Sequence, residues 1–531
     1  MVAFGSTILD HTLMDKTKEQ LQHSRPIDVH VWSDHPEAHR FVDEIWLKDF
    51  SSVFDFTGVG KRPRASPKSQ LKVLLLDLYV AWLTDPDLLI AIGKSQRYYK
   101  AKSRYNELHI SYVIVQVLNH AIDCGYIEEK LGYQLDTGFG HVTRIWPTSK
   151  LIKYFQGSNF SLVDIKHNPE REVIILNPSK IKASTDEVTL VDAKLESEEA
   201  IRRSSRKPVE YDDDDYVQIP EMRRNLRAYN GLLDNTFVDI CSLDEPEVLI
   251  EIIKKGVKTI QRVSIGQHNK FVRRIFYRAD WSLGGRFHGG WWQQVGSGYR
   301  KDIFINDKPT IEQDYSGLHV SLAYGLEKIQ PPSDPYVVEQ VFDLDAMFQR
   351  DVIKQLVLTA INAKTLKATF SAFRSSQKKG SPPKKYKDKQ LQVLLDAFIE
   401  SNQSIRGYLC SDFGVKLMAI DGRITNRIIN HFTAQQIPIL SVHDSYITQD
   451  EYTEELNGVM NDAIAEEIGF RVNIKSEGIS YNHYLHFRGQ GGSNYNDYYD
   501  MLSSIPKHEL TKGYKERLDQ FKLKLASSLV H

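Results

Sequence analysis

The stretch from Thr310 to Leu326, TIEQDYSGLHVSLAYGL, most constrains the fold, because its residue pattern changes once and abruptly. Strand-like residues lead up to Asp314, Ser316-Gly317 follows as a turn, and apolar residues then recur at helical spacing. This order predicts a strand, a tight turn and a helix, with the Asp314 carboxylate at the strand end. Such a carboxylate either belongs to an ordinary capped turn or holds a metal ion at a cleft.

A second acidic residue stands at the tip of a predicted hairpin. The segment QIPILSVHDSYIT, residues 436–448, reads as two short strands hinged at His443-Asp444-Ser445. An acid in apolar surroundings is costly unless it is exposed or paired. If the fold sets Asp314 and Asp444 on adjacent strands, their carboxylates suit two Mg²⁺ ions, or Mn²⁺ in their place, that bridge a triphosphate and an attacking hydroxyl.

Between these acids, a predicted helix carries two cations on one face. Arg350, Lys354, Leu358 and Asn362 are spaced four residues apart in QRDVIKQLVLTAINAKT. Arg350 would bind a polyphosphate through two hydrogen bonds from its planar guanidinium, and Lys354 through the single charge of its ammonium group. The alternative is a solvated basic stripe on an amphipathic helix.

The order of these motifs resembles motifs A, B and C of family A DNA polymerases and the related single-subunit phage-type RNA polymerases. The matching residues are Asp314 to His319 (DYSGLH), Arg350 with Lys354, and Val442 to Ser445 (VHDS). Upstream, Gly285-Arg286-Phe287 with Gln293 or Gln294 and Arg300 resembles the stretch that touches primer and template. Asp334-Pro335-Tyr336 resembles a short acid-x-aromatic signal of the family.

The resemblance implies a role for each matching residue. Asp314 and Asp444 would hold two Mg²⁺ ions, with the carbonyl of Tyr315 as a further ligand. The nucleotide site would comprise Arg350, Lys354, His319, Leu358 and Asn362. The nucleic acid would be contacted by Arg286, Gln293, Arg300 and His443.

Three residues or motifs depart from the family pattern, and two of them, His319 and motif C, leave the preferred sugar open. His319 stands where the DNA polymerases usually carry a glutamate that blocks the ribose 2′-hydroxyl. Asn362 replaces a tyrosine eight residues after the helix lysine, and motif C reads HDS as in the RNA polymerases. The interval between motifs A and C is short, which implies reduced fingers.

Residues 1–150 resemble a winged helix-turn-helix domain that binds nucleic acid. Two apolar helices are predicted at Ser69–Leu83 and Leu108–Asp123, followed by two strands around the Asp136-Thr137-Gly138 turn. Between the helices, tyrosines interleave with basic residues, among them Lys94, Arg97, Lys100 and Arg104. This pattern suits a nucleic-acid backbone with stacked bases, or else a solvated basic loop.

The remaining regions carry weaker signals. Residues 151–215 are expected to form a β-rich connector and a charged linker. Residues 216–283 are expected to form a thumb-like helical region, with helix over 246–279. Residues 284–531 would form the palm and reduced fingers, and a loop within them presents Lys384 and Lys385 to phosphates.

Composition sets further bounds. The net charge of −1 means that nucleic-acid contacts must come from local basic patches. Three scattered cysteines indicate a reducing compartment. The sequence contains no stretch of about eighteen apolar residues, so no membrane span is predicted. A cytoplasmic monomer without membrane contact is expected.

The sequence therefore predicts an α+β right-hand polymerase with an N-terminal winged-helix-like domain. It would add nucleoside monophosphates from nucleoside triphosphates to a primer on a DNA template, in phage or mobile-element replication. Three alternatives remain: a primase or small RNA polymerase that makes RNA, a template-independent nucleotidyltransferase, and a non-catalytic DNA-binding replication initiator.

Overall fold

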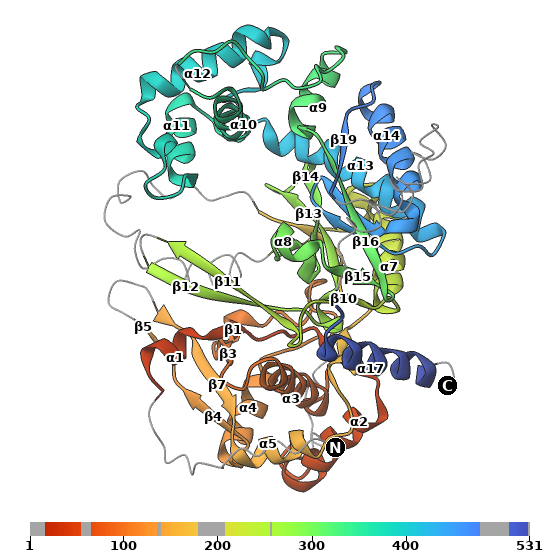
Figure 1. The fold of residues 1–531 in the computed structure, drawn as a ribbon. Helices are drawn as coiled ribbons and strands as arrows, with labels where there is room; N and C mark the ends of the chain where they lie inside the picture. The colour runs from red at the N-terminus through yellow and green to blue at the C-terminus, as the bar shows by residue number, and fades with distance from the viewer. Residues whose placement is uncertain are drawn as a thin grey trace. The chain divides into compact units, whose positions relative to one another are not determined.

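The computed structural model describes residues 16–54, 65–134, 140–178, 208–254, 257–342, 344–477 and 509–528. These residues form two compact units, one up to Arg171 and the other from Glu172 onwards. Each unit combines helices with strands, so the expected mixed α+β class is confirmed (Figure 1). Among the described residues, the search for a helix long and apolar enough to cross a bilayer finds none.

The first unit is built around one buried helix, α3 (Pro67–Thr84). The Ser66 hydroxyl accepts the Ser69 amide at 3.1 Å and Pro67 follows as the first helical residue, which is a favoured helix start. The other helices are α1 (Lys18–Gln22), α2 (Pro36–Ile45), α4 (Val113–Asp123) and α5 (Ser149–Gln156). α3 and α4 pack together and supply much of the core.

A four-stranded sheet of order β1-β3-β7-β4 completes this core. β1 (Ser24–Pro26) runs parallel to β3 (Leu89–Ile92), and β7 (Thr143–Pro147) pairs antiparallel with both β3 and β4 (Ile127–Lys130). Two short ladders join β2 (Val31–Trp32) to β8 (Lys166–His167) and β5 (Tyr133–Gln134) to β6 (Gly140–His141). The two predicted helices and the hairpin are thus confirmed, and the tip residues 135–139 lie outside the described part.

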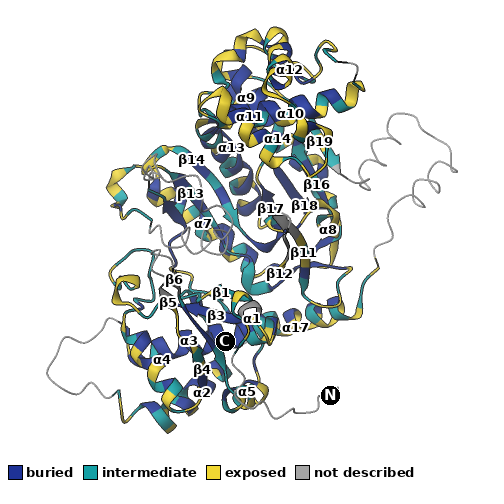
Figure 2. Ribbon diagram, turned by 90° about the vertical axis from the view of Figure 1, so that its left-hand side faces the viewer, coloured by how far each residue is buried: buried dark blue, intermediate teal, exposed yellow. Residues whose placement is uncertain are grey.

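The second unit is organised on a six-stranded sheet of order β10-β15-β16-β18-β17, with β19 also paired to β16. The strands are β10 (Val238–Ile240), β15 (Ile303–Ile305), β16 (Lys308–Tyr315), β17 (Ile439–Val442), β18 (Ser445–Gln449) and β19 (Ile474–Glu477). Every residue of β17 and β18 is buried (Figure 2). A hairpin buried this fully gives the turn between its strands a rigid base.

A second sheet and several helices surround this one. The sheet joins β9 (Ile174–Leu176), β13 (Val272–Tyr277) and β14 (Asp280–Gly289), while β11 (Glu247–Lys254) and β12 (Val257–Ser264) pair only with each other among the described strands. The helices are α7 (Ile219–Asp234), α8 (Ser297–Arg300), α9 (Leu318–Leu326), α10 (Ala346–Asn362), α11 (Leu366–Ser376), α12 (Asp388–Ser401), α13 (Gly414–Ala434), α14 (Thr453–Ile468) and α17 (Lys512–Ser528).

The local predictions around both aspartates are confirmed. β16 and α9 form the expected strand, turn and helix, and Gly317 occupies the left-handed region (φ 67°) that the turn requires. β17 and β18 form the expected hairpin, and α10 carries the four-residue spacing from Arg350 to Asn362.

Two regional predictions are wrong. The helix expected over 246–279 is three strands, β11, β12 and β13, because this segment is rich in β-branched residues. The described residues 151–178 and 208–215 do not form the expected separate region: Leu151 and Phe155 lie in the core of the first unit, and β9 pairs with β13 in the second. The boundary between the described units therefore lies at Arg171 and not at residue 150.

The packing of α13 on β14 depends on a glycine. A Cβ added at Gly422 would lie 2.2 Å from the backbone oxygen of Gly285, which cannot move aside like a side-chain end. We expect Gly422→Ala to lower the free energy of unfolding by about 2–3 kcal/mol or more. Gly458→Ala on α14 is the matched control: no atom lies within 4 Å of its Cβ, so helix propensity should raise stability by about 0.5–1 kcal/mol. Urea unfolding measures both, and equal effects would contradict the packing argument.

Candidate functional site

Asp314 and Asp444, far apart in the sequence, lie at the same end of neighbouring strands. Asp314 on β16 is the register partner of Ser445 on β18, and Asp444 immediately precedes Ser445 in the turn. The Tyr315 amide donates to the Asp444 carbonyl oxygen at 3.4 Å. The fold therefore brings together the backbone positions of the two aspartates that the sequence singled out.

The turn that carries Asp444 holds an unusual backbone conformation. His443 lies in the left-handed region (φ 58°), which costs a residue other than glycine roughly 1–2 kcal/mol. Ser441, two residues earlier, is fixed through its carbonyl, which accepts the Trp292 indole at 3.1 Å and the Gln293 amide at 2.8 Å. Gln293, expected to contact nucleic acid, thus has its amide nitrogen directed at the protein backbone.

A third carboxylate, which the sequence analysis did not select, supports the same turn. Glu312 lies two residues before Asp314 and so on the same face of β16. Arg300 donates to its two oxygens at 2.8 and 2.9 Å, and the Ser445 hydroxyl donates to it at 2.6 Å. Arg300, expected at the nucleic acid, is therefore half-buried in an ion pair that braces the turn.

On the other side of Asp314 the sheet places a lysine. Lys475 on β19 is the second register partner of Asp314 and is exposed. The Tyr315 side chain points into the core, where its hydroxyl donates to the Met460 carbonyl at 2.5 Å. That anchor fixes the backbone whose carbonyl is the expected third metal ligand.

Arg286, expected at the nucleic acid, joins β14 to two helices. Its guanidinium forms an ion pair with Asp421 on α13 and donates to His319 Nε2 on α9 at 2.7 Å. Because arginine only donates, His319 accepts through Nε2 and is neutral, and burial with the Arg286 charge lowers its pKa to about 3. Burial raises the pKa of Asp421 to about 7 in spite of Arg286.

The imidazoles near Asp444 are also uncharged at neutral pH. His288 and His443 pack edge to face with centroids 6.0 Å apart. Burial, the neighbouring His443 and Arg286 lower the pKa of His288 to about 4, and burial lowers that of His443. The positive charge near the aspartates therefore comes from arginine and lysine.

The cations of α10 differ in their present contacts. Arg350 donates to Asp334 at 2.6 Å and to Asp351 at 3.0 Å, so a phosphate ligand would have to displace these carboxylates. The Lys354 side chain makes no hydrogen bond or ion pair within the described part of the chain. Lys354 is thus the cation that a polyphosphate could engage without breaking a contact.

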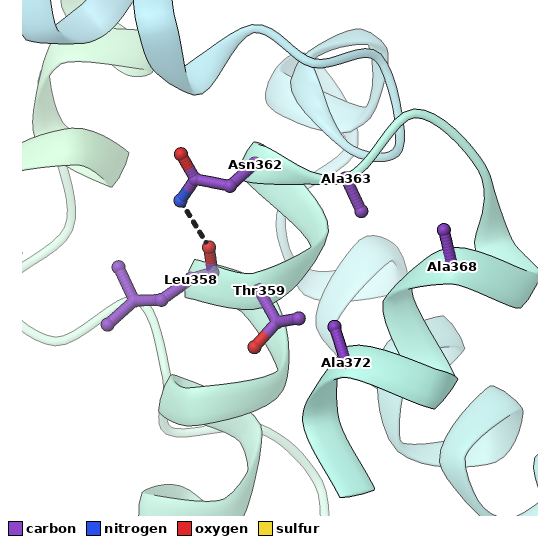
Figure 3. A pocket seen from close by; sticks show the side chains of 6 residues that line it. All are labelled: Leu358, Thr359, Asn362, Ala363, Ala368 and Ala372. Atoms are coloured by element: carbon purple, nitrogen blue, oxygen red, sulfur yellow. Dashed lines mark hydrogen bonds between the residues drawn. The ribbon is translucent and has the colours of Figure 1, made fainter. Parts of the chain in front are cut away.

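Leu358 and Asn362 line an open hollow of about 420 Å³ between α10 and α11 (Figure 3). Its other lining residues are small, namely Thr359, Ala363, Ala368 and Ala372. The Asn362 amide donates to the Leu358 carbonyl at 2.8 Å, as the dashed line in Figure 3 marks. Two residues expected at the nucleotide therefore border a hollow whose floor is mostly apolar.

Tyr336 is a site residue that the sequence analysis named only as part of a motif. The side chain is 2% exposed, stacks on Phe398 and has the Arg350 guanidinium 6.0 Å from its ring. Its hydroxyl has no hydrogen-bond partner among the described residues and would lie 3.3 Å from a Cβ at Gly317. A buried hydroxyl without a partner among the described residues is free to donate to a bound molecule or to a water.

The remaining basic residues fall into two groups. Lys94 is ion-paired with Glu129 at 2.6 Å, and Lys384 donates to the Arg374 and Gln377 carbonyls at the end of α11. These two have structural contacts. The residues with exposed side chains are Arg97, Lys100 and Lys385, while Arg104 is half-buried.

The donor set at the aspartates fits Mg²⁺. Mg²⁺ is usually bound by one or two carboxylates together with substrate phosphates and waters, and seldom by a full protein cage. The described residues contain no cluster of three or more His, Cys, Asp or Glu side chains able to hold a metal. Two aspartates on neighbouring strand ends, with the Tyr315 carbonyl beside them, are a donor set of the kind that Mg²⁺ accepts.

No protein-family model matches this chain, and the comparison with curated proteins finds no match either. The functional assignment therefore depends on the arrangement of these side chains.

Proposed function

We propose that the chain is a template-directed nucleotidyltransferase that extends a primer with nucleoside triphosphates. The observation that carries the proposal is the position of Asp314 at the end of β16 beside Asp444 in the β17–β18 turn. The same unit supplies the cations of α10, so carboxylates and phosphate-binding groups occur together. In this reading the β16–β18 sheet is the palm and α10 to α12 are reduced fingers.

In the reaction, the primer 3′-hydroxyl attacks the α-phosphate of the nucleotide and pyrophosphate leaves. Bound Mg²⁺ would supply Lewis-acid stabilisation of the phosphate charge. Asp314 and Asp444 would hold the ions, the Glu312–Ser445 hydrogen bond keeps the Asp444 turn in place, and Lys354 meets the triphosphate. Arg350 would also bind the triphosphate once phosphate oxygens replace Asp334 as its ion-pair partner.

The first unit supports a nucleic-acid-binding role. α3, β3, α4 and the β4–β7 hairpin follow one another with sheet order β3-β7-β4, an order that supports the winged-helix interpretation. Arg97 and Lys100 are exposed between β3 and α4. Because this unit could bind DNA without catalysis, a non-catalytic replication initiator is the second candidate function.

Extension of a labelled primer on a DNA template, with Mg²⁺ and either dNTPs or rNTPs, tests the proposal. Incorporation directed by the template base is the expected result, and the preferred sugar separates a DNA polymerase from a primase or small RNA polymerase. Incorporation that ignores the template would instead favour terminal transfer. If the protein binds the duplex but incorporates no nucleotide with any nucleotide or metal, the non-catalytic replication initiator is the function that remains.

The unsatisfied Tyr336 hydroxyl gives a prediction for nucleotide affinity. We expect Tyr336→Phe to raise KM for the incoming nucleotide roughly tenfold, because a hydrogen bond to the ligand of about 1–1.5 kcal/mol is lost. Stability should not fall, since the hydroxyl has no partner among the described residues. Steady-state extension and urea unfolding measure the two effects.

Tyr324→Phe is the matched control for this change. The Tyr324 hydroxyl donates to Asn402 at 2.6 Å, so its removal should lower stability by about 1 kcal/mol and leave KM unchanged. If Tyr336→Phe instead behaves like Tyr324→Phe, the Tyr336 hydroxyl is structural and not part of the nucleotide site.

A further inference from the structure

Residues 377–389, which lead from the end of α11 into α12, form a strongly charged segment that the proposed catalytic site does not use. Their sequence, QKKGSPPKKYKDK, contains six lysines and one acidic residue, Asp388, in a chain whose net charge is −1. Arg374 on α11 already forms an ion pair with Asp388 at 2.7 Å. The lysines therefore repel one another, and the segment has no other acidic residue to offset the repulsion.

The backbone of this segment is fixed to the helices on both sides of it. Lys384 donates to the carbonyls of Arg374 at 3.0 Å and Gln377 at 2.9 Å and so satisfies the end of α11. Arg374 donates in turn to the Tyr386 carbonyl at 3.3 Å, and Pro383 is buried. α11 and α12 both contact α10, and the three helices lie together in Figure 1. The segment is thus a folded part of the surface and presents its outward side chains from a fixed base.

The other five lysines point away from these contacts. All have exposed side chains, namely Lys378, Lys379, Lys385, Lys387 and Lys389. None of the five forms an ion pair within the described part of the chain. A polyanion could therefore bind all of them without displacing a carboxylate.

The kind of side chain identifies the polyanion. Lysines bind phosphates without reading sequence, whereas binding of a single strand usually adds exposed aromatic rings that stack on its bases. The aromatic residues of α11, Phe370 and Phe373, are buried, and Tyr386 is half-buried. Within 377–389, all of them described, no large apolar side chain is exposed to anchor the segment in a membrane. The phosphate backbone of a duplex, whose bases are already stacked, fits this surface best.

We propose that residues 377–389 bind the phosphate backbone of a nucleic-acid duplex through the five exposed lysines. Lys384, which the sequence placed among the phosphate contacts, instead supports the segment from below. The inference rests on the proposed function, because the duplex would be the primer–template that the catalytic site extends. The segment would hold this duplex independently of catalysis and so reduce dissociation between additions.

The test measures binding of the full chain to a fluorescent primer–template duplex, without nucleotide, at increasing salt. The variant is Lys378→Gln with Lys385→Gln, one lysine from each side of the two prolines. Loss of two phosphate contacts should reduce the slope of log affinity against log salt by about 1.8, and the affinity at about 0.1 M salt roughly tenfold or more. The control is Lys515→Gln with Lys522→Gln, which removes the same charge from exposed positions on α17 and should leave the slope unchanged.

Equal losses in both double variants would overturn the proposal, because overall charge would then explain binding, and an unchanged slope in Lys378→Gln with Lys385→Gln would overturn it as well. If that variant weakens binding only to a single strand of the same sequence, or only to phosphatidylserine vesicles, the partner is not a duplex and the proposal fails. A loss specific to this segment in a protein that extends no primer would support the duplex site and refute the polymerase.

Discussion

Replacing Asp314 or Asp444 by asparagine is expected to slow magnesium-dependent primer extension by roughly 1,000-fold or more. Metal-assisted stabilisation of the phosphate charge is worth several kcal/mol, and each ~1.4 kcal/mol is a factor of ten in rate. Asparagine keeps the size of the side chain but lacks the negative charge that a divalent ion requires. Single-turnover extension of a labelled primer–template measures the loss.

Folding and duplex binding should survive these substitutions, since both residues lie at strand ends and a duplex is held by other groups. Glu451→Gln is the control. Glu451 pairs with Lys308 at the opposite end of β16, about half exposed, and its change should not affect extension. Full activity in either aspartate variant would refute the two-carboxylate site, and equal loss in Glu451→Gln would point to a general effect of lost charge.

Arg286→Ala is expected to cause the largest loss of stability, about 3–5 kcal/mol at pH 8, because it leaves Asp421 buried without its counter-ion. The pKa of Asp421 is raised from 3.8 to about 7, so between these values the folded protein holds a proton that the unfolded chain releases. Stability from this group is therefore greatest at low pH and falls as the pH rises towards 7. At pH 5.5 the loss in Arg286→Ala should be much smaller.

Urea unfolding at both pH values, with peptide-resolved hydrogen exchange over α13, measures this effect. Adding Asp421→Asn to Arg286→Ala should recover most of the loss at pH 8 and little at pH 5.5, since it removes the buried charge. Arg423→Ala is the control on the same helix: the Arg423 side chain is half exposed and its partner Glu467 keeps a second ion pair with Arg427, so the loss should be under about 1 kcal/mol. A loss independent of pH would mean that Arg286 stabilises the fold through packing and not through charge.

The structural elements around Asp314 and Asp444 were predictable because short-range rules govern them. A glycine permits the left-handed residue after β16, and the apolar runs on both sides of His443-Asp444 dictate a buried hairpin. The strand pattern of β11 and β12 was also readable. Alternating β-branched residues on both sides of Lys255-Gly256 indicate a hairpin.

The residues that sequence reasoning missed act through partners distant in the chain. Glu312 matters because Arg300 and Ser445 meet on it, and Asp421 because it faces Arg286. No spacing rule reveals such pairings. The same holds for Gln293, Arg300 and Lys384, whose side chains could face nucleic acid by composition but are directed at the protein in the structure.

The sequence by itself determined where strands and helices begin near the two aspartates, since turn and periodicity signals act over a few residues. Only the tertiary structure decided that Asp314 and Asp444 become neighbours, that Glu312 braces the Asp444 turn through Ser445, and that three imidazoles near the site are neutral. The reason is physical: register between β16 and β18 and the burial of charges depend on contacts across the whole sheet, which no local pattern encodes.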